Sequence, residues 1–539
     1  MKKILLIIIF TISSCKSFKK LDYKDNARLD NLNIKKIKSF KNWHLKDFET
    51  DTILGISLDR AYDTFLIHKK AKPVIVAIID TEIDTNHKGL KNKIWLNKDE
   101  IPNNNIDDDR NGYTDDINGW NFKGNKNGES SKFVNFEYVR VLKKLNVKYR
   151  NLDSTSIKKD KNYPLFLRAT KAYKKREEYE IKEKENAQRL SDIYFNTKKK
   201  IKGLLNGSNK LTIEVIDSFK KLKKIDEFNA AVLTHCIKNN TDSLAIEKRK
   251  FLSRERIDKL MNLNYNDRIF PNDNESNILD SLYGNKYVNN NLHLMTHGTK
   301  MAGVIKNISK KDEISIMPIV ISSYGDEHDK DIALAIRYAV NNGAKVINMS
   351  FGKEFSMNQK WVIEAIKYAE KKDVIILSSA GNSGFDLDKK NNYQYPSDNF
   401  DSEKEETNNF ITIGSSSYSF DKKLKVKSSN YGKSNVDLFA PGRKISTIAP
   451  NEKESYTGGT SGACAVVSGV AGLIRSYYPK LTASQVKYIL MESGLEFDIE
   501  VNTPTKEDKD KTTPFNQLSK SGKILNAYNV LLMADSISR

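Results

Sequence analysis

A six-residue apolar run that ends in a carboxylate constrains the fold of this chain more than any other feature. Residues 74–79 are all apolar and are followed by Asp80, the pattern of a strand buried on both faces of a parallel sheet. Further along, helical apolar spacing alternates with short strand-like runs, at residues 329–342, 345–349, 359–372, 374–377 and 410–413. This alternation predicts an α/β fold with a parallel sheet and helices on both faces.

The carboxyl-terminal part continues the helical pattern. Residues 461–478 have helical apolar spacing that stops before Pro479, and Thr482 followed by Gln485 fits a capping box that opens another helix. Residues 523–533 are expected to close the same domain. A separate carboxyl-terminal domain is therefore not expected.

Between residues 124 and 290 the composition changes, because Lys and Glu dominate and strand signals are few. Apolar residues recur there at three- and four-residue spacing, but the turns between them are charged. The pattern predicts a mostly helical insertion and not a continuous coiled coil. The predicted organisation is a signal peptide (residues 1–14), a tether (15–40), a body in two parts (41–123 and 291–539) and the insertion (124–290).

The first fourteen residues have the pattern of an export signal, in which Lys2 and Lys3 precede an apolar stretch too short to span a bilayer. Small residues then precede Cys15, and this segment resembles the lipobox of bacterial lipoproteins. The resemblance implies an exported protein of the bacterial cell envelope, held at a membrane by a lipid on Cys15. The alternative is an ordinary cleaved signal and a secreted product.

The formal charge of +21 is large, but Lys, Asn and Ile are frequent throughout, as an A+T-biased genome would give. No nucleic-acid-binding motif accompanies the charge, so nucleic acid is not expected as a partner. The 29% of charged residues argues against a polytopic membrane protein. Cys236 and Cys464 lie far apart and offer neither a disulfide framework nor metal-ligand spacing.

Three segments carry residue types that do chemistry, and they occur in the order Asp, His, Ser. Asp80 ends the buried strand, at the edge where open α/β sheets place functional groups. His-Gly-Thr at 297–299 precedes a helix-like stretch, and Gly-Gly-Thr-Ser-Gly-Ala at 458–463 opens the helix predicted above. Taken alone, each segment also fits a purely structural role, as a helix cap, a packed side chain or a turn. Their order and context together indicate one catalytic site.

These segments resemble the Asp-Thr-Gly, His-Gly-Thr and Gly-Thr-Ser-Met-Ala motifs of the subtilisin family of serine peptidases. Residues 379–382, Ser-Ala-Gly-Asn, are similar to the segment that carries the family's oxyanion-hole Asn, and Tyr395-Pro396 and 438–442 match further landmarks. The resemblance spans about residues 40–123 and 291–535. It implies a subtilisin-like sheet interrupted by the helical insertion, and a serine endopeptidase that acts on proteins or peptides without a cofactor in its chemistry.

The resemblance implies a catalytic triad of Asp80, His297 and Ser461. His297 would take the Ser461 proton and later protonate the leaving amine, while Asp80 would fix the imidazole tautomer. The Ser461 N–H and the side-chain amide of Asn382 would bind the oxyanion. The Gly-x-Ser-x-Gly elbow of α/β-hydrolases is disfavoured because residue 463 is Ala and the triad order differs. No His-Glu-x-x-His motif is present for a zinc peptidase.

Substrate of this family lies as an extended strand against one wall of the cleft, with a primary pocket beyond it. The residue before Tyr395-Pro396 would lie near the base of that pocket. Because this residue is Gln, a neutral polar group, no strong demand for a charged substrate side chain is expected. The substrate-binding residues that the resemblance implies are Ser350, Phe351, Gly352, Ala380, Gly381 and Gln394.

Residues 107–116 are strongly acidic and match the first half of a calcium loop. Position twelve of that loop is Asn118 where an EF-hand has Glu, so Asp115 or Asp116 would have to complete the cage. The two interpretations left open are a structural calcium ion and a merely acidic turn. The candidate ligands are Asp107, Asp109, Asn111, Tyr113 and Asp115.

Four positions depart from the family motifs: Glu82 replaces a Gly, Lys300 a frequent His, Gly462 a Met and Ala465 a Pro. A side chain at residue 82 is expected to crowd the triad or to require a φ that favours Gly. Cys464 is expected to be a small buried packing residue.

Two alternatives to an active, general endopeptidase remain at this point. In the first, the chain is a catalytically silent lipoprotein of subtilisin fold that binds peptides or partner proteins. In the second, the insertion docks one partner or covers the cleft, which would make the enzyme a dedicated processing peptidase. The oligomeric state, the natural substrate and the choice of membrane have no signature in the sequence.

Overall fold

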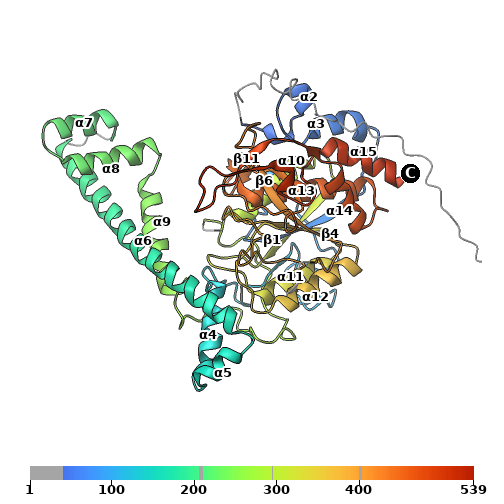
Figure 1. Cartoon of the computed structure of the whole chain (residues 1–539), viewed down its shortest axis with the longest axis horizontal. Helices are drawn as coiled ribbons and strands as arrows, with labels where there is room; N and C mark the ends of the chain where they lie inside the picture. Colours follow the sequence, from blue (N-terminus) through green and yellow to red (C-terminus); the bar gives the residue numbers. More distant parts are fainter. Residues whose placement is uncertain (1–39, 206–210, 294, 400–403) are drawn as a thin grey trace, which may run out of the picture.

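The structure is a computed structural model that describes residues 40–205, 211–293, 295–399 and 404–539. The predicted signal peptide, Cys15 and nearly all of the tether lie outside these ranges, so the predictions about them stay predictions. Within these ranges, no helix combines the length and the apolar character that crossing a membrane requires. The described chain consists of a body built on a sheet and a helical arm (Figure 1).

The body is built on a nine-stranded sheet with the strand order β10-β13-β7-β6-β5-β4-β1-β3-β2. The strands from β7 through β3 pair in parallel, and the β10–β13 pair at one edge is antiparallel. The strands are β1 (Val74–Asp80), β2 (Trp120–Asn121), β3 (Ile314–Val320), β4 (Ala344–Met349), β5 (Ile375–Ser379), β6 (Phe410–Ser416), β7 (Leu438–Pro441), β10 (Leu495–Glu496) and β13 (Lys523–Ile524).

Helices cover both faces of this sheet because its central strands are apolar on both sides. Along β1, Val76 and Ile78 face one core while Ala77 and Ile79 face the other, as the two-residue period of a strand requires. The first face is covered by α10 (His297–Ile308), α13 (Gly459–Tyr477), α14 (Ala483–Glu492) and α15 (Ala527–Ser538), and the second by α11 (Asp329–Asn341) and α12 (Gln359–Lys371).

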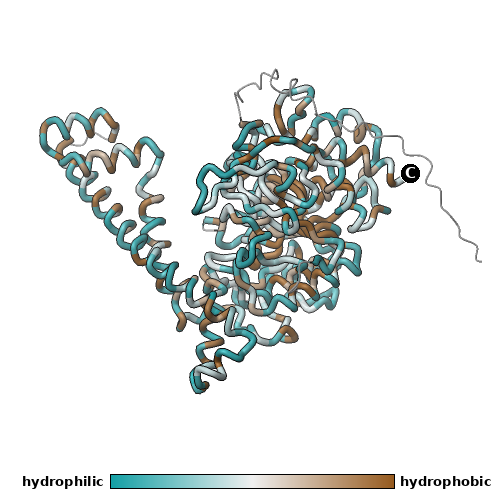
Figure 2. Tube along the Cα trace, in the orientation of Figure 1, coloured by the Kyte–Doolittle hydropathy of each residue, from teal (hydrophilic) through white to brown (hydrophobic). Residues whose placement is uncertain are grey.

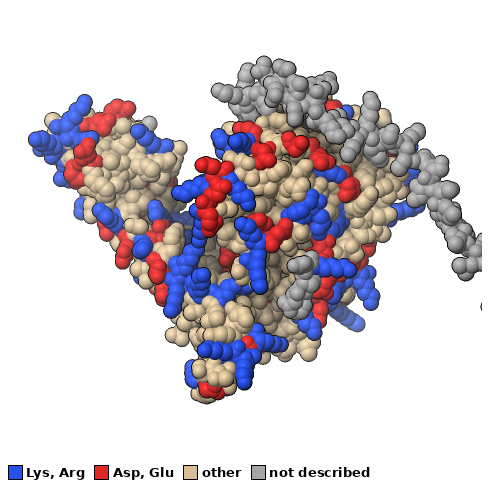
Figure 3. All heavy atoms as spheres, in the orientation of Figure 1, with Lys and Arg blue, Asp and Glu red and all other residues tan. Residues whose placement is uncertain are grey.

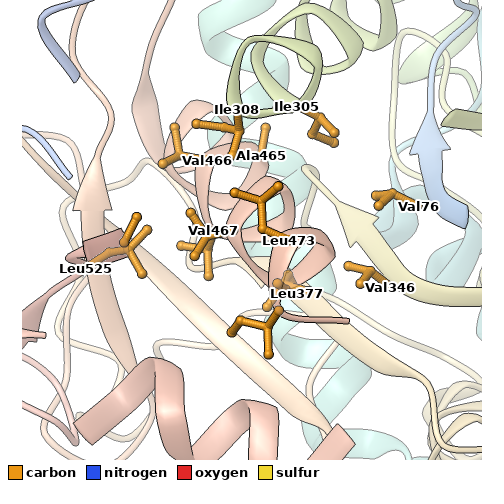
Figure 4. Close-up of a cluster of buried hydrophobic side chains, with 14 of the residues drawn as sticks. Val76, Ile305, Ile308, Val346, Leu377, Ala465, Val466, Val467, Leu473 and Leu525 are labelled. Atoms are coloured by element: carbon orange, nitrogen blue, oxygen red, sulfur yellow. The ribbon is translucent and has the colours of Figure 1, made fainter. Parts of the chain in front are cut away.

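Figure 4 shows the first core, in which Val76, Val346 and Leu377 of three neighbouring strands meet side chains of α13. Fully burying one such side chain contributes roughly 1.5–3 kcal/mol. The predicted α/β fold, with a parallel sheet and helices on both faces, is confirmed.

Short elements complete the body around the sheet edges. The hairpin of β8 (Ile445–Ala449) and β9 (Lys453–Thr457) packs against α10, and β11 (Glu500–Asn502) pairs with β12 (Thr512–Pro514). The remaining helical turns are η1 (Trp43–Leu45), α2 (Phe48–Asp51), α3 (Leu58–Ala61), η2 (Tyr62–Leu66), η3 (Lys88–Leu90) and η5 (Phe515–Gln517).

A helical arm, residues 137–260, leaves the body between β2 and α10 (Figure 1). It consists of α4 (Glu137–Tyr149), α5 (Ser154–Lys159), α6 (Tyr163–Leu204), α7 (Ile213–Lys221), α8 (Glu227–Lys238), α9 (Ser243–Glu255) and η4 (Arg256–Leu260). The 42-residue α6 is about 60 Å long at 1.5 Å per residue. The helical character of this region is therefore as predicted, whereas the boundaries at 124 and 290 stay predictions.

The arm has two small cores of its own. At the tip, Tyr194 and Ile201 of α6 pack against residues of α7, α8 and α9. At the base, Val141 and Leu145 of α4 pack with Ala169 of α6 and with Phe355 of the body. Much of the rest of the arm is hydrophilic along its length (Figure 2). The base is thus anchored to the body while the tip stands away from it.

Positive charge is not spread evenly over the chain. The arm contains 32 of the 90 Lys and Arg residues but only 17 of the 69 Asp and Glu residues. A bias of composition along the whole chain does not by itself produce this concentration. Figure 3 shows Lys and Arg along the hollow that separates the arm from the body.

Candidate active site

The three predicted catalytic residues come from three different elements and meet at the carboxyl edge of the sheet. Asp80 is the last residue of β1, His297 is the first residue of α10, and Ser461 lies in the first turn of α13. Asp80 and His297 line one cavity of about 370 Å³ together with Ser350. The Ser461 hydroxyl donates to the Ser350 carbonyl at 2.8 Å, so all three predicted residues border the same part of the cleft.

Asp80 and His297 form a close pair. Nδ1 of His297 lies 2.8 and 2.9 Å from the two carboxylate oxygens of Asp80, which is almost fully buried. Burial opposes the charged imidazolium, but the Asp80 carboxylate outweighs this and raises the pKa of His297 above its usual value. Since Nδ1 faces the carboxylate, Nε2 is the ring nitrogen left to exchange a proton.

The amino-terminal end of α10 docks closely onto the backbone after β1. The Gly298 N–H donates to Oγ1 of Thr81 at 2.8 Å, and the Asp84 N–H donates to Oγ1 of Thr299 at 2.9 Å. A Cβ atom at Gly298 would lie 2.3 Å from the Thr81 carbonyl oxygen. The Gly of the His-Gly-Thr motif is therefore required for this contact, which fixes His297 opposite Asp80.

Glu82 neither crowds the triad nor adopts a backbone conformation that favours Gly, so that expectation is wrong. Its φ is not positive, and its buried carboxylate accepts hydrogen bonds from the backbone N–H and from Nδ2 of Asn291, the latter at 2.8 Å. The side chain points to the segment that leads into α10. It thus holds Asn291 of that segment in place.

Asn382 lies against the peptide that leads into Ser461. Its Oδ1 accepts from the Thr460 N–H at 3.0 Å, and a Cβ atom at Gly459, where φ is +75°, would lie 2.7 Å from the same oxygen. Among the described residues, no acceptor is bound to Nδ2 of Asn382. The exposed amide is therefore held beside the nucleophile with a donor still available.

The predicted walls of the primary pocket face each other, and the Gln394 side chain lies between them. A Cβ atom at Gly352 would lie 1.7 Å from Nε2 of Gln394, and one at Gly381 would lie 2.6 Å from its Oε1. Nε2 also donates to the Ser379 carbonyl at 3.3 Å. Gln394 thus occupies the slot and does not merely form its base.

The other predicted substrate-binding residues lie beside this slot. Phe351 lines the cavity next to His297. Ala380 is buried, and its carbonyl accepts from Nδ2 of Asn430 at 2.7 Å. The structure therefore brings the two predicted walls together at one end of the catalytic cleft.

The acidic loop is arranged differently from the predicted calcium cage. Oxygens of Glu100, Asp109 and Asp116 lie within 4.8 Å of one another. Of these residues, Asp109 belongs to the predicted ligand set and Asp116 was the alternative to Asp115 for completing it. Asp107 accepts from the backbone N–H groups of residues 111 and 112, and Asp115 pairs with Lys286 at 2.8 Å.

Asn111 and Tyr113 also have other partners. The Asn111 side chain bridges Asp109 and Asp116, and the Tyr113 ring packs on Trp120 and Tyr338. Glu100 was not among the candidates because it lies outside the Asp-rich run and joins it only through the fold.

Two residues of the cleft escaped the sequence analysis. Glu327, seven residues after β3, and Lys248 of α9 both line the cavity of the catalytic pair. The position of Glu327 shortly after the carboxyl end of a strand next to β1 is a usable signal. Lys248 has none, because only the folded arm brings it to this site.

Cys464 is a packing residue, as predicted. It is fully buried, and burial raises the pKa of its thiol to about 12. Cys236 is also buried, and neither forms a disulfide.

Comparison with known protein families shows the family to which this protein belongs. The profile of the Subtilase family matches residues 71–518, a span that includes Asp80, His297 and Ser461. Because the match covers most of the chain, this protein belongs to the subtilase family.

Two similar proteins come from Bacillus subtilis (strain 168). Its cell wall-associated protease is 28% identical over 229 residues, a match that covers 40% of this chain and 23% of that protein. Its major intracellular serine protease is 30% identical over 217 residues, a match that covers 38% of this chain and 64% of that protein. The chain therefore spans less than two thirds of the length of either relative.

A solved structure of a cold-adapted subtilisin-like serine proteinase is 25% identical, with a TM-score of 0.34, and the match covers 43% of this chain and 74% of that one.

Proposed function

We propose that this protein is a serine endopeptidase that hydrolyses peptide bonds through an acyl-enzyme on Ser461. The observation that carries the proposal is the hydrogen-bonded pair of Asp80 and His297. This pair lines a cavity together with Ser350, whose carbonyl accepts from the Ser461 hydroxyl. Membership of the subtilase family supports a serine peptidase.

The proposed reaction has two halves that use the same groups. Rotation about the Cα–Cβ bond of Ser461 turns its hydroxyl from the Ser350 carbonyl toward Nε2 of His297. His297 takes the hydroxyl proton as the oxygen attacks the substrate carbonyl, and it then protonates the leaving amine as the C–N bond breaks. Water repeats the attack on the ester and frees Ser461. Asp80 stays ionised and stabilises the imidazolium throughout.

The oxyanion of the tetrahedral intermediate is proposed to bind two donors at the start of α13. One is the Ser461 N–H, since the first N–H groups of a helix have no intrahelical acceptor. The other is Nδ2 of Asn382, whose Oδ1 is fixed by the Thr460 N–H. One such donor typically contributes about 3–4 kcal/mol of transition-state stabilisation.

The primary pocket is proposed to accept small residues such as Gly, Ala and Ser. Gln394 lies directly on Gly352 and Gly381, so a large side chain would have to displace it. This proposal sharpens the expectation that the pocket does not select for charge.

One observation favours a catalytically silent, peptide-binding protein as the second candidate. The Ser461 hydroxyl donates to the Ser350 carbonyl and not to His297. If this arrangement persisted with substrate, the nucleophile would lack a base. A serine-directed fluorophosphonate separates the two candidates, because only an assembled triad reacts with it at a useful rate.

The proposal is tested with purified mature protein and casein. We expect cleavage by the wild-type protein and none by Ser461→Ala, and both should have the same melting temperature because the Ser461 hydroxyl is only half buried. Equal cleavage by the two proteins would eliminate Ser461 as the nucleophile.

The protein is further proposed to be exported and held at the bacterial envelope by a lipid on Cys15, where it meets protein or peptide substrates. The support is the sequence before Cys15. A Cys15→Ser variant should lose metabolic labelling with a fatty acid and move from the membrane fraction to the soluble fraction; retention of label would contradict the assignment.

A structural calcium ion is proposed for the acidic loop, with Glu100, Asp109 and Asp116 as its carboxylate ligands. The donor set fits, because three carboxylates converge within 4.8 Å and two of them are buried. Burial raises the pKa of Asp116 to about 7, as expected where negative charge lacks a compensating cation. Calcium would add rigidity at this site and takes no part in the proposed chemistry.

A further inference from the structure

The cavity beside the catalytic pair contains a carboxyl group that the proposed reaction does not use. Glu327 lines this cavity together with Asp80, His297, Ser350 and Phe351. It belongs to the segment after β3 that forms one wall of the cleft, while residues 350–353 form the other. The binding mode that the family resemblance implies, an extended strand against residues 350–352, would bring the acyl side of a substrate past Glu327.

The base of the arm ties the two walls together at their far end. Nη2 of Arg140 in α4 donates to the carbonyl oxygens of Asp326 and Glu327 at 2.9 and 3.0 Å. The fully buried Lys353 of the opposite wall also donates to the Glu327 carbonyl and pairs with Asp329 at 2.8 Å. Side chains from the opposite wall and from the arm therefore meet at the main chain of Glu327.

A second arm residue covers the opposite wall. Nη2 of Arg168 in α6 donates to the Glu354 carbonyl at 3.2 Å, and its guanidinium stacks on the rings of Phe355 and Tyr393 at 4.5 and 3.9 Å. Together with the Arg140 contacts, this attaches the base of the arm to the segments on both sides of the cavity that Glu327 lines.

The Glu327 side chain forms no ion pair among the described residues. Arg140 and Lys353 bond its main-chain carbonyl, the charge of Lys353 partly offsets the effect of burial on its pKa, and Lys248 lines the same cavity. Its Oε1 accepts from the Ser322 hydroxyl at 2.6 Å. Burial raises the pKa of Glu327 to about 7. A buried carboxylate without an ion-pair partner is unfavourable, so the site is suited to a ligand that brings positive charge.

We propose that Glu327 binds a cationic group, an ammonium or a guanidinium, on the acyl half of the substrate. The inference rests on the proposed function. Two parts of a substrate present this chemistry: the free amino terminus of a short chain, and the side chain of a Lys or Arg residue. In either case the carboxylate makes a charge-assisted hydrogen bond to the ligand.

The test uses synthetic peptides that share one Ala-rich cleavage segment and differ in the position of positive charge. One series has two to five residues before the scissile bond with a free or an acetylated amino terminus. The peptides of the other series are longer and acetylated, and have either Lys or norleucine at each position before the scissile bond in turn. Wild type is compared with Glu327→Gln and with the control Glu354→Gln, which removes an exposed carboxyl group nearby that does not line the cavity.

Wild type should cleave the best cationic peptide at least about tenfold more efficiently than its neutral partner. Glu327→Gln should lose this preference through a higher KM for the cationic peptides, and Glu354→Gln should keep it. If acetylation of the peptide lowers the efficiency of cleavage by wild type, the amino terminus is the ligand. If replacing Lys by norleucine lowers it, the ligand is a side chain.

Two results would overturn the inference. A wild-type enzyme that cleaves charged and neutral peptides equally well refutes it without any variant, and so does a folded Glu327→Gln protein that keeps the preference. Fluorophosphonate labelling separates these failures from failure of the proposed function. If the enzyme is labelled but has no charge preference, only this inference is refuted. If the wild-type protein is not labelled, the proposed function is refuted and this inference with it.

Discussion

Replacing Gln394 by Ala should open the primary pocket to large apolar residues. The side chain lies between the two walls, where Cβ atoms at Gly352 and Gly381 would come within 1.7 and 2.6 Å of its amide. The change removes Cγ, Cδ, Oε1 and Nε2, a volume close to that of a Leu side chain. Full burial of Leu contributes roughly 1.5–3 kcal/mol, so kcat/KM for Leu before the scissile bond should rise by about 10- to 150-fold.

The assay is a profile of the residue before the scissile bond, read by mass spectrometry on a peptide library. Asn392→Ala is the matched control, since its amide bonds the Asp386 carbonyl and stays outside the slot. The Ser379 carbonyl loses one hydrogen bond in Gln394→Ala, which costs about 1 kcal/mol of stability. A folded Gln394→Ala enzyme with an unchanged preference for small residues would refute the reasoning about this pocket.

Three further predictions concern the catalytic groups and the acidic loop. Asp80→Asn should lower kcat by about 10⁴-fold. Because the carboxylate raises the pKa of His297, the acid limb of the pH–rate profile should also move to lower pH; an unmoved limb would contradict the pairing. Asn382→Ala should lower kcat by about 10²- to 10³-fold with little change in KM, whereas the neighbouring Ser383→Ala should not. Calcium should raise the free energy of unfolding of wild type by about 2.7 kcal/mol at a concentration 100 times Kd, seen as a higher melting temperature, and should not stabilise Asp116→Asn; equal shifts would exclude this site.

Much of the fold was predictable because its signals are local. The apolar run at 74–79 became β1 (Val74–Asp80), and the helical spacing at 359–372 became α12 (Gln359–Lys371). The capping box of Thr482 and Gln485 is present with both of its hydrogen bonds. Such patterns depend on neighbouring residues along the chain, so the sequence contains them in full.

The finer parts of the site were not predictable, since they depend on contacts between residues far apart in the chain. Glu82 reaches Asn291 across 209 positions, and Lys286 takes Asp115 out of the predicted calcium cage across 171 positions. The position of Gln394 between Gly352 and Gly381 likewise depends on three separate loops. The sequence shows which residues are present, but the packing of the loops decides which partner each one meets.

The central claim is that His297 activates Ser461 as the nucleophile. The most direct measurement is the site and rate of fluorophosphonate labelling, with the adduct located by tandem mass spectrometry. We predict one adduct per molecule, on Ser461, with labelling abolished in Ser461→Ala and greatly slowed in His297→Ala. An adduct at another residue, or equally fast labelling of Ser461 in His297→Ala, would contradict the account.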